Sequence, residues 1–210
     1  MSDKFTLRRG LRNLVVAKVT ADTADAYTVE EDVRQLLPVA ELSVSVDQDK
    51  AQVYFDNTVF ASVAREGNSE VSITGATLPA DMMAYITGKT VDSVTGLVVD
   101  DGEAHDANFA LGFIMDKIDG SSDYVWFLKG SFNVPDESAK TKDDSTDTNG
   151  SELTFTAIKT IHNFGSVEAP NHCKRVIMDT NKSELVESSD FFAQVVTPDN
   201  MATICKAKTV

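Results

Sequence analysis

Two neighbouring stretches near the middle of the chain alternate large apolar side chains with other residues. The large side chains are Phe109, Leu111, Phe113 and Met115 in the first stretch, and Tyr124, Trp126, Leu128 and Phe132 in the second. A period of two places such a row on one face of a strand. The residues between the stretches contain Asp119-Gly120, a common turn between antiparallel strands. We therefore predict a β-hairpin, with its second strand covered on both faces over residues 124–128.

The rest of the pattern predicts further strands and few helices. Period-two alternation or short apolar runs indicate strands at residues 14–20, 39–46, 51–55, 58–65, 70–76, 90–99, 152–162 and 173–178. Residues 47–50 and 66–68 have the composition of turns. Pro135 follows the predicted hairpin and ends its ladder, since proline has no backbone N–H to donate.

One helix is predicted over residues 79–87. Pro79 suits the first helical position and Gly88 suits the residue just past the end. Met82, Met83 and Ile86 have the spacing of one helical face and are interpreted as core contacts. Residues 188–190, Ser-Ser-Asp, predict the N-cap of a second helix that Pro198 stops.

The expected fold is mainly β, a sandwich or barrel-like protomer with one or two flanking α-helices. No repeat, linker or composition shift divides the 210 residues, so one domain is expected over residues 1–210. It would carry a polar N-terminal arm over about residues 1–13. Long loops are expected at about residues 47–67 and 135–150.

Charge and cysteine content narrow the function classes. The formal net charge is -14, from 33 acidic and 19 basic residues, which argues against wrapping nucleic acid because that affinity comes from Lys and Arg. Two cysteines, Cys173 and Cys205, predict free thiols in a reducing compartment. No signal peptide or membrane span is predicted. We expect a soluble chain that is not secreted.

Catalytic and metal-binding motifs are not found. His162, His172 and Cys173 do not have the paired spacing of zinc sites, and His105 is interpreted as a surface residue. The acidic run that ends at Asp106 lacks EF-hand spacing, although its carboxylates offer oxygen ligands for Ca²⁺; the run comprises Asp100, Asp101, Glu103 and Asp106. No phosphate loop, nucleophile elbow or H-E-x-x-H motif occurs. We predict no enzyme activity, cofactor or metal.

Several stretches, taken in order, resemble one protein family. They are residues 10–14 (GLRNL), 53–57 (VYFDN), 70–74 with Leu78-Pro79 and the helix ending at Gly88, 110–113 (ALGF), 124–132 (YVWFLKGSF) and Thr141-Lys142. Together the chain is similar to the major tail (tail tube) proteins of long-tailed bacteriophages of Gram-positive bacteria. Asp143 departs from the family, which commonly has a glycine there. No Ig-like domain is expected after the tube domain, although some relatives append one.

The resemblance implies a structural virion protein. Six protomers would form a ring with an inner β-barrel, and stacked rings would form the tail tube through which genome DNA passes without specific binding. The implied partners are other copies of the chain, the tape measure protein, the tail terminator and the distal tail protein. The protein would reside in the virion tail, and in the host cytoplasm during assembly. The implied contacts between protomers or rings are Arg8, Arg9, Arg12, Asp56, Asn57, Lys140, Lys142, Asp143 and Asp144.

Physical arguments agree with this picture and leave alternatives open. Long strands have unpaired edges that a second chain can complete, and head-to-tail stacking does not close, so it builds a filament. We expect the polar face of the predicted hairpin and its neighbouring strands to line an acidic lumen. The alternatives are a tube protein of a contractile secretion system, a stand-alone carbohydrate- or ligand-binding β-domain, and an enzyme with a buried ionisable cluster.

Overall fold

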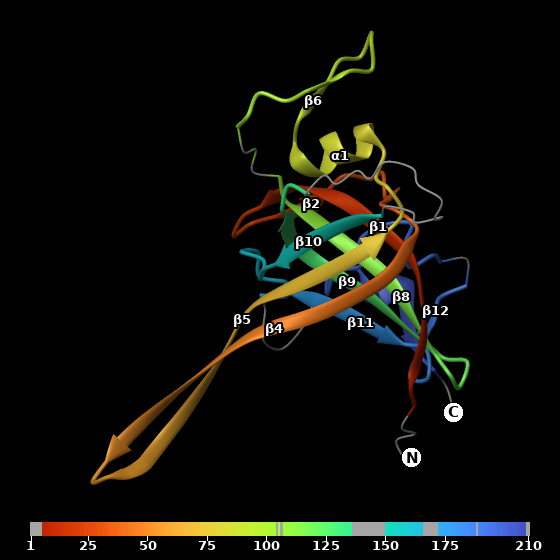
Figure 1. The fold of residues 1–210 in the computed structure, drawn as a ribbon. Coiled ribbons are helices and arrows are strands. Elements are labelled where there is room, and N and C mark those ends of the chain that lie inside the picture. The colour runs from red at the N-terminus through yellow and green to blue at the C-terminus, as the bar shows by residue number, and fades with distance from the viewer. Residues whose placement is uncertain are drawn as a thin grey trace, which may run out of the picture.

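The structure is a computed structural model that describes residues 6–103, 105, 107–135, 150–165, 172–187 and 189–208. It is mainly β (Figure 1), as predicted. The strands are β1 (Arg8–Asp22), β2 (Tyr27–Val29), β3 (Arg34–Gln35), β4 (Val39–Phe55), β5 (Thr58–Gly75), β6 (Thr90–Val91), β7 (Val98–Val99), β8 (Phe109–Lys117), β9 (Ser122–Phe132), β10 (Ser151–Ala157), β11 (Arg175–Asp179), β12 (Ser183–Leu185) and β13 (Cys205–Ala207). The helices are α1 (Ala80–Thr87) and α2 (Met201–Ile204).

One large antiparallel sheet forms the body of the protein. Its strand order is β2-β1-β8-β9-β10-β5-β4, with β3 added beside β1 and β11 beside β9. The sheet curls so that β4 lies close to β1 although no ladder joins them, and Figure 1 shows β4 and β5 crossing over β8 and β9. The architecture is therefore that of a β-sandwich whose layers belong to one continuous sheet, consistent with a tail tube protomer.

The β8–β9 hairpin is the centre of the body, because both of its faces are buried. On one face, Phe109, Phe113 and Phe127 pack against β5, β10 and α1. On the other, Trp126 and Leu128 pack under the C-terminal segment. The predicted hairpin and its two-sided burial are confirmed, but the expectation that its polar face lines a lumen is wrong, since neither face is open to solvent.

Helix α1 forms where the sequence predicts it. Its end at Gly88 has φ 74°, the left-handed conformation that a glycine adopts without a Cβ clash. Pro79 is the N-cap rather than the first helical residue. Ala84 and Ile86 are buried, and Met82 and Met83 pack against the core as interpreted.

Several strand limits differ from the prediction. β1 begins at Arg8, not at residue 14, because the polar residues 8–12 pair with β8. The predicted loop at residues 47–67 is a hairpin, since β4 and β5 stay paired from Val39 to Phe55 across three register shifts. The predicted strand 90–99 is a small hairpin of β6 and β7. β10 ends at Ala157, and Ile161 beyond it is 55% exposed.

The predicted helix after residues 188–190 is also wrong. Asp190 Oδ1 accepts a hydrogen bond from the backbone N–H of Phe192 at 2.9 Å, which is the capping chemistry expected, but it closes a turn and no helix follows. Phe191, Val195 and Val196 are instead buried over Trp126, so tertiary packing decides the local backbone. The predicted loop 135–150 lies outside the described residues except for its two end positions.

Candidate assembly surfaces

The most prominent exposed feature is the outer part of the β4–β5 pair, which we call the arm (residues 47–67). Figure 1 shows the arm projecting well beyond the body. Its strands pair from Gln48 opposite Glu66 to Phe55 opposite Thr58. Nothing in the described chain packs over its tip, because Phe55, Val59 and Phe60 are 60%, 50% and 75% exposed. A two-stranded hairpin without a covered face is marginally stable in water, which indicates a contact surface.

The arm ends in a tight turn at Asp56 and Asn57. Both residues have positive φ, 48° and 62°, as a two-residue type I′ hairpin turn requires, and Asp and Asn tolerate that region better than most residues. The rings of Phe55 and Phe60 meet edge to face with centroids 5.1 Å apart. The two residues that the resemblance implicates in contacts are therefore at the extreme tip, next to an exposed aromatic pair.

The base of the arm is held to the body by one lysine. Lys174 Nζ donates to Glu66 Oε1 at 2.5 Å and to the carbonyl oxygen of Gly67 at 3.1 Å. The Lys174 side chain is 8% exposed, and its charge lowers the pKa of Glu66. The ladder shifts register here, between the pairs at Val46 and Gln48, so a bulge and a lysine clamp together mark where the arm leaves the body.

A second exposed surface lies on the outward side of β4, β5 and β10, which we call the acidic-hydroxyl face. Cross-strand register puts three rows of three polar residues side by side: Glu41, Thr74 and Glu152; Ser43, Ser72 and Thr154; Ser45, Glu70 and Thr156. The alternate positions Val71, Ile73, Leu153 and Phe155 are buried. The face contains three carboxylates, six hydroxyl groups and no cation. Sequence analysis missed it, because the pairing of β10 with β5 is long-range.

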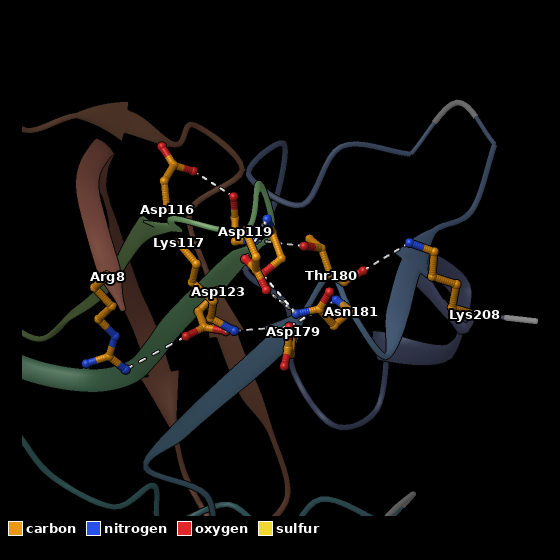
Figure 2. Close-up of polar contacts among 11 residues, drawn as sticks. Arg8, Asp116, Lys117, Asp119, Asp123, Asp179, Thr180, Asn181 and Lys208 are labelled. Carbon is orange, nitrogen blue, oxygen red and sulfur yellow. Dashed lines mark hydrogen bonds and ion pairs between the residues drawn. The ribbon is translucent and has the colours of Figure 1, made fainter. Parts of the chain in front are cut away.

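A third feature is a polar cluster where the β8–β9 turn meets both ends of the described chain (Figure 2). Lys117 Nζ lies 2.5 Å from Asp123 Oδ1 and 3.1 Å from Asp179 Oδ1. Burial lowers the pKa of Lys117, but these two carboxylates outweigh it and the pKa is raised. Lys208 Nζ donates to the carbonyl oxygen of Thr180 at 3.4 Å. The cluster joins β1, β9, β11 and the C-terminal segment, and its role is structural.

Two of the basic residues near the N-terminus, Arg8 and Arg12, contact aspartates of the β8–β9 hairpin. Arg12 donates to both carboxylate oxygens of Asp116, at 2.8 and 3.2 Å, and this pairing lowers the pKa of Asp116. Arg8 reaches Asp123 at 3.8 Å, and Arg9 is exposed. Lys140, Lys142, Asp143 and Asp144 lie outside the described residues.

A buried ion pair ties the end of β1 to β9. Asp22 Oδ2 accepts from Lys129 Nζ at 2.7 Å, and the two side chains are 3% and 10% exposed. The backbone N–H groups of Ile161 and His162 also donate to Asp22, at 2.8 to 3.0 Å. Burial raises the pKa of Asp22, but these donors outweigh it, so the pKa lies below its ordinary value. The carboxylate therefore connects the end of β1 to β9 and to the segment that follows β10, and its role is structural.

The residues considered for metal or catalytic chemistry do not come together. His162 Nδ1 lies 3.3 Å from the carbonyl oxygen of Ala24, whereas Cys173 Sγ donates to the carbonyl oxygen of Arg175. Asp101 pairs with His105 at 2.9 Å and Asp100 with Lys89. Across the described ranges, no three His, Cys, Asp or Glu side chains form a possible metal site. No described helix is long and apolar enough to cross a membrane.

Surface hollows in the described part of the chain are a further kind of candidate site. One of about 290 Å³ lies beside α1, one of about 280 Å³ beside β11 and α2, and one of about 330 Å³ beside Ile86 and Val134. Each is small compared with most ligand-binding pockets. The exposed surfaces described above are therefore the features best suited to a function in assembly.

Comparison with known proteins identifies the family. A family model described as phage tail tube protein matches residues 44–182, which is more than half of the 210 residues. The matched span includes the arm, α1, the β8–β9 hairpin, β10 and β11. A search of curated proteins found no match. The resemblance to major tail proteins is confirmed at the level of the family, which is structural rather than enzymatic. The chain belongs to the phage tail tube protein family, whose members self-assemble into the tube of the virion tail.

Proposed function

We propose that this protein forms hexameric rings that stack into the tail tube and that the tube conducts genome DNA during ejection. The observation that carries the proposal is the arm, a hairpin that extends beyond its own body and ends in exposed phenylalanines. Such a surface is completed only by another molecule. In a tube-forming family, the natural partner is a second copy.

Ring closure is supported by the sheet edges. In the described part of the chain, β4 has only β5 as a ladder neighbour, and the strand path ends at β4 on one side and β2 on the other. Free edges pair readily with another chain, and cyclic symmetry completes every edge without further lateral growth. Native mass spectrometry of the assembled rings should give six copies of the chain. A different closed number would contradict the hexamer, and a persistent monomer would contradict ring formation.

We assign the lumen wall to the acidic-hydroxyl face. Lys or Arg on a wall would bind DNA by counterion release, whereas this face presents Glu41, Glu70 and Glu152 among hydroxyl groups. Changing all three glutamates to lysine should leave tubes intact and slow DNA ejection. A matched triple change to glutamine separates the effect of added positive charge from the loss of negative charge. Ejection at the wild-type rate in the lysine variant would exclude this face from the lumen.

Ring stacking is assigned first to the arm. The loop that the sequence predicts over about residues 135–150, including Lys140, Lys142, Asp143 and Asp144, is a second candidate, because long polar loops are often functional. Deleting the loop should leave single rings, and tubes of normal length would exclude it. Arg8, Arg9 and Arg12 are a weaker candidate, because Arg12 already pairs with Asp116 inside the same protomer. Charge reversal of Arg8 and Arg9 tests this.

The proposed partners are the tape measure protein, which would set tube length, the tail terminator and the distal tail protein. Genome DNA passes through without specific binding. The rings assemble in the host cytoplasm, and we propose a Gram-positive host from the ordered motifs around residues 124–132. Pull-down of these tail proteins by the full chain during infection tests the partner assignments, and their absence from the bound fraction would contradict them.

A further inference from the structure

The tip of the arm, formed by Phe55, Asp56 and Phe60, combines apolar and acidic side chains, and we call it the plug. It presents the exposed rings of Phe55 and Phe60, which pack against each other, and one carboxylate, Asp56, in the turn that follows Phe55. The turn that carries them is fixed by its positive φ angles and by a hydrogen bond from Thr58 Oγ1 to the carbonyl oxygen of Phe55 at 3.2 Å. Among the described residues, no cation lies within ion-pair distance of the Asp56 carboxylate. The plug is therefore apolar on its flanks and negatively charged at its end.

The hollow beside α1 combines apolar and positively charged side chains, which complement the apolar and acidic residues of the plug. Its cavity of about 290 Å³ is lined by Met82, Ala84, Tyr85 and Val91, with Lys18, Arg34, Lys89 and one carboxylate, Asp81. Arg34 stacks over the Tyr85 ring at 4.3 Å and pairs with Asp32, and Lys89 pairs with Asp100. The lysine at position 18 is different, because none of the described carboxylates lies within ion-pair distance of its Nζ. In a chain of net charge -14, an unpaired half-buried lysine is a specific recognition feature.

The plug and this hollow are at opposite ends of the molecule. Figure 1 shows the arm tip and α1 far apart, with the body between them. A tip cannot reach the hollow of its own chain, but it can reach that of the next copy. A contact between two different patches related by translation repeats without closing, which is the symmetry of a stack.

We propose that the tip of the arm of one protomer docks into the hollow beside α1 of a protomer in the next ring, with Asp56 facing Lys18 and the phenylalanines against Met82 and Tyr85. This inference rests on the proposed function and adds the acceptor site to it. The contact places an exposed carboxylate beside an unpaired cation and removes apolar surface from water. Each protomer gives one tip and receives one, so a growing stack keeps a free set of tips at one end and a free set of hollows at the other.

The other two hollows fit the tip less well. The hollow beside β11 is lined by Ile177, Phe191 and Met201, but its one lysine, Lys206, already pairs with Glu184. The hollow beside Ile86 and Val134 contains Glu103, and its one lysine, Lys89, already pairs with Asp100. Of these three hollows, the one beside α1 combines apolar side chains with a lysine that none of the described carboxylates neutralises.

A double-mutant cycle on the full chain tests the pairing. The readout is the critical concentration for tube formation, measured by sedimentation and electron microscopy. Asp56→Asn keeps a residue that tolerates the positive φ of the turn, and Lys18→Gln keeps the length of the lysine. Each change should raise the critical concentration at least about tenfold, equivalent to 1.4 kcal/mol. The double variant should be no worse than either single one, because both remove the same interaction.

Matched variants make the test specific. Lys182→Gln removes an exposed lysine elsewhere, and its effect should be small and additive with Asp56→Asn. Met82→Ser in the proposed hollow should weaken stacking, whereas Ile177→Ser beside β11 should not. Thermal melting of the Asp56, Lys18 and Lys182 variants should match the wild type, which separates lost docking from lost folding.

The outcomes separate this inference from the function on which it rests. Wild-type protein that forms neither rings nor tubes contradicts both. Wild-type tubes together with normal assembly of Asp56→Asn and Lys18→Gln contradict the docking site alone, as does additivity between those two changes. Loss of stacking in Ile177→Ser but not in Met82→Ser assigns the tip to the hollow beside β11 and also overturns the inference.

Discussion

The two halves of the β4–β5 pair share one continuous ladder but have opposite environments. In the half that belongs to the body, Val71 and Ile73 are 0% and 1% exposed, whereas at the tip of the arm Phe55 and Phe60 are 60% and 75% exposed. Backbone pairing is the same in both halves, so hydrogen bonding does not distinguish them. Burial does, and it is the dominant favourable contribution to folding. From this difference in burial we expect the body to fold by itself, whereas the arm can bury its apolar surface only against a partner.

The same type of substitution, Phe→Ala, can be made once in the body and once in the arm, and its effect on stability compared. Phe155→Ala in the body should lower the free energy of unfolding by about 3–5 kcal/mol, because Phe155 is fully buried and its removal leaves a cavity. Phe60→Ala in the arm should change it by less than about 0.5 kcal/mol but should impair tube formation. Denaturant unfolding of the protomers and sedimentation of assembled protein measure the two effects. Similar losses of stability in both variants would refute the division into body and arm.

Charge gives a second comparison, with a smaller expected effect. Asp22→Asn should destabilise the body by about 2–3 kcal/mol near neutral pH, since it leaves buried Lys129 without its carboxylate. Because the folded-state pKa of Asp22 is lowered, its stabilising contribution is present above the unfolded pKa of about 3.9 and is lost as pH falls through the lower folded value.

The stability curves of wild type and Asp22→Asn should therefore converge toward low pH, and urea unfolding at several pH values measures this. Asp56→Asn is the control in the arm, and its stability curve should follow the wild type throughout. A constant difference between wild type and Asp22→Asn from acidic to neutral pH would show that the carboxylate is not stabilised as described.

The junction between the two regions should give the smallest effect. Lys174→Gln removes the charge that holds Glu66 and the carbonyl of Gly67, and should lower the free energy of unfolding less than Asp22→Asn does, because Glu66 is exposed to solvent. Amide hydrogen exchange should become faster around residues 46–48 and 66–69 while β8 and β9 keep their protection. Lys159→Gln, an exposed lysine near the same junction, is the control. Equal exchange in Lys174→Gln and wild type would show that the lysine does not hold the arm.

The body is the part that the sequence predicts well, and the reason is again burial. The period-two rows of residues 109–115 and 124–132 and the Asp-Gly turn define β8 and β9, and Pro79 and Gly88 bracket α1. The arm is different, because residues 47–50 have turn composition and no apolar row marks a buried face. Asp56 and Asn57 were placed at a break, but the length of the hairpin depends on cross-strand pairing that local composition does not contain.

The candidate surfaces show the same limit. The pairing of Arg12 with Asp116, which is 104 residues away in the chain, is not visible in the sequence, and the contact of Arg12 with another protomer or ring stays a prediction. The acidic-hydroxyl face needs the register of three strands that are distant in sequence, and the hollow beside α1 needs Lys18 brought next to Tyr85. Residue types alone did not indicate either site, because alternating Ser, Thr and Glu are also typical of any solvated strand face.

The central claim is that the arm builds the tube while the body folds without it, and one measurement tests it directly. Residues 50–64 are replaced by Asn-Gly, which closes the hairpin at the Asp49–Arg65 pair, and the truncated and full-length chains are compared by negative-stain electron microscopy at equal concentration. We predict long tubes from the full-length chain and isolated rings from the truncated one, with similar melting temperatures. Tubes of normal length from the truncated chain would contradict the account.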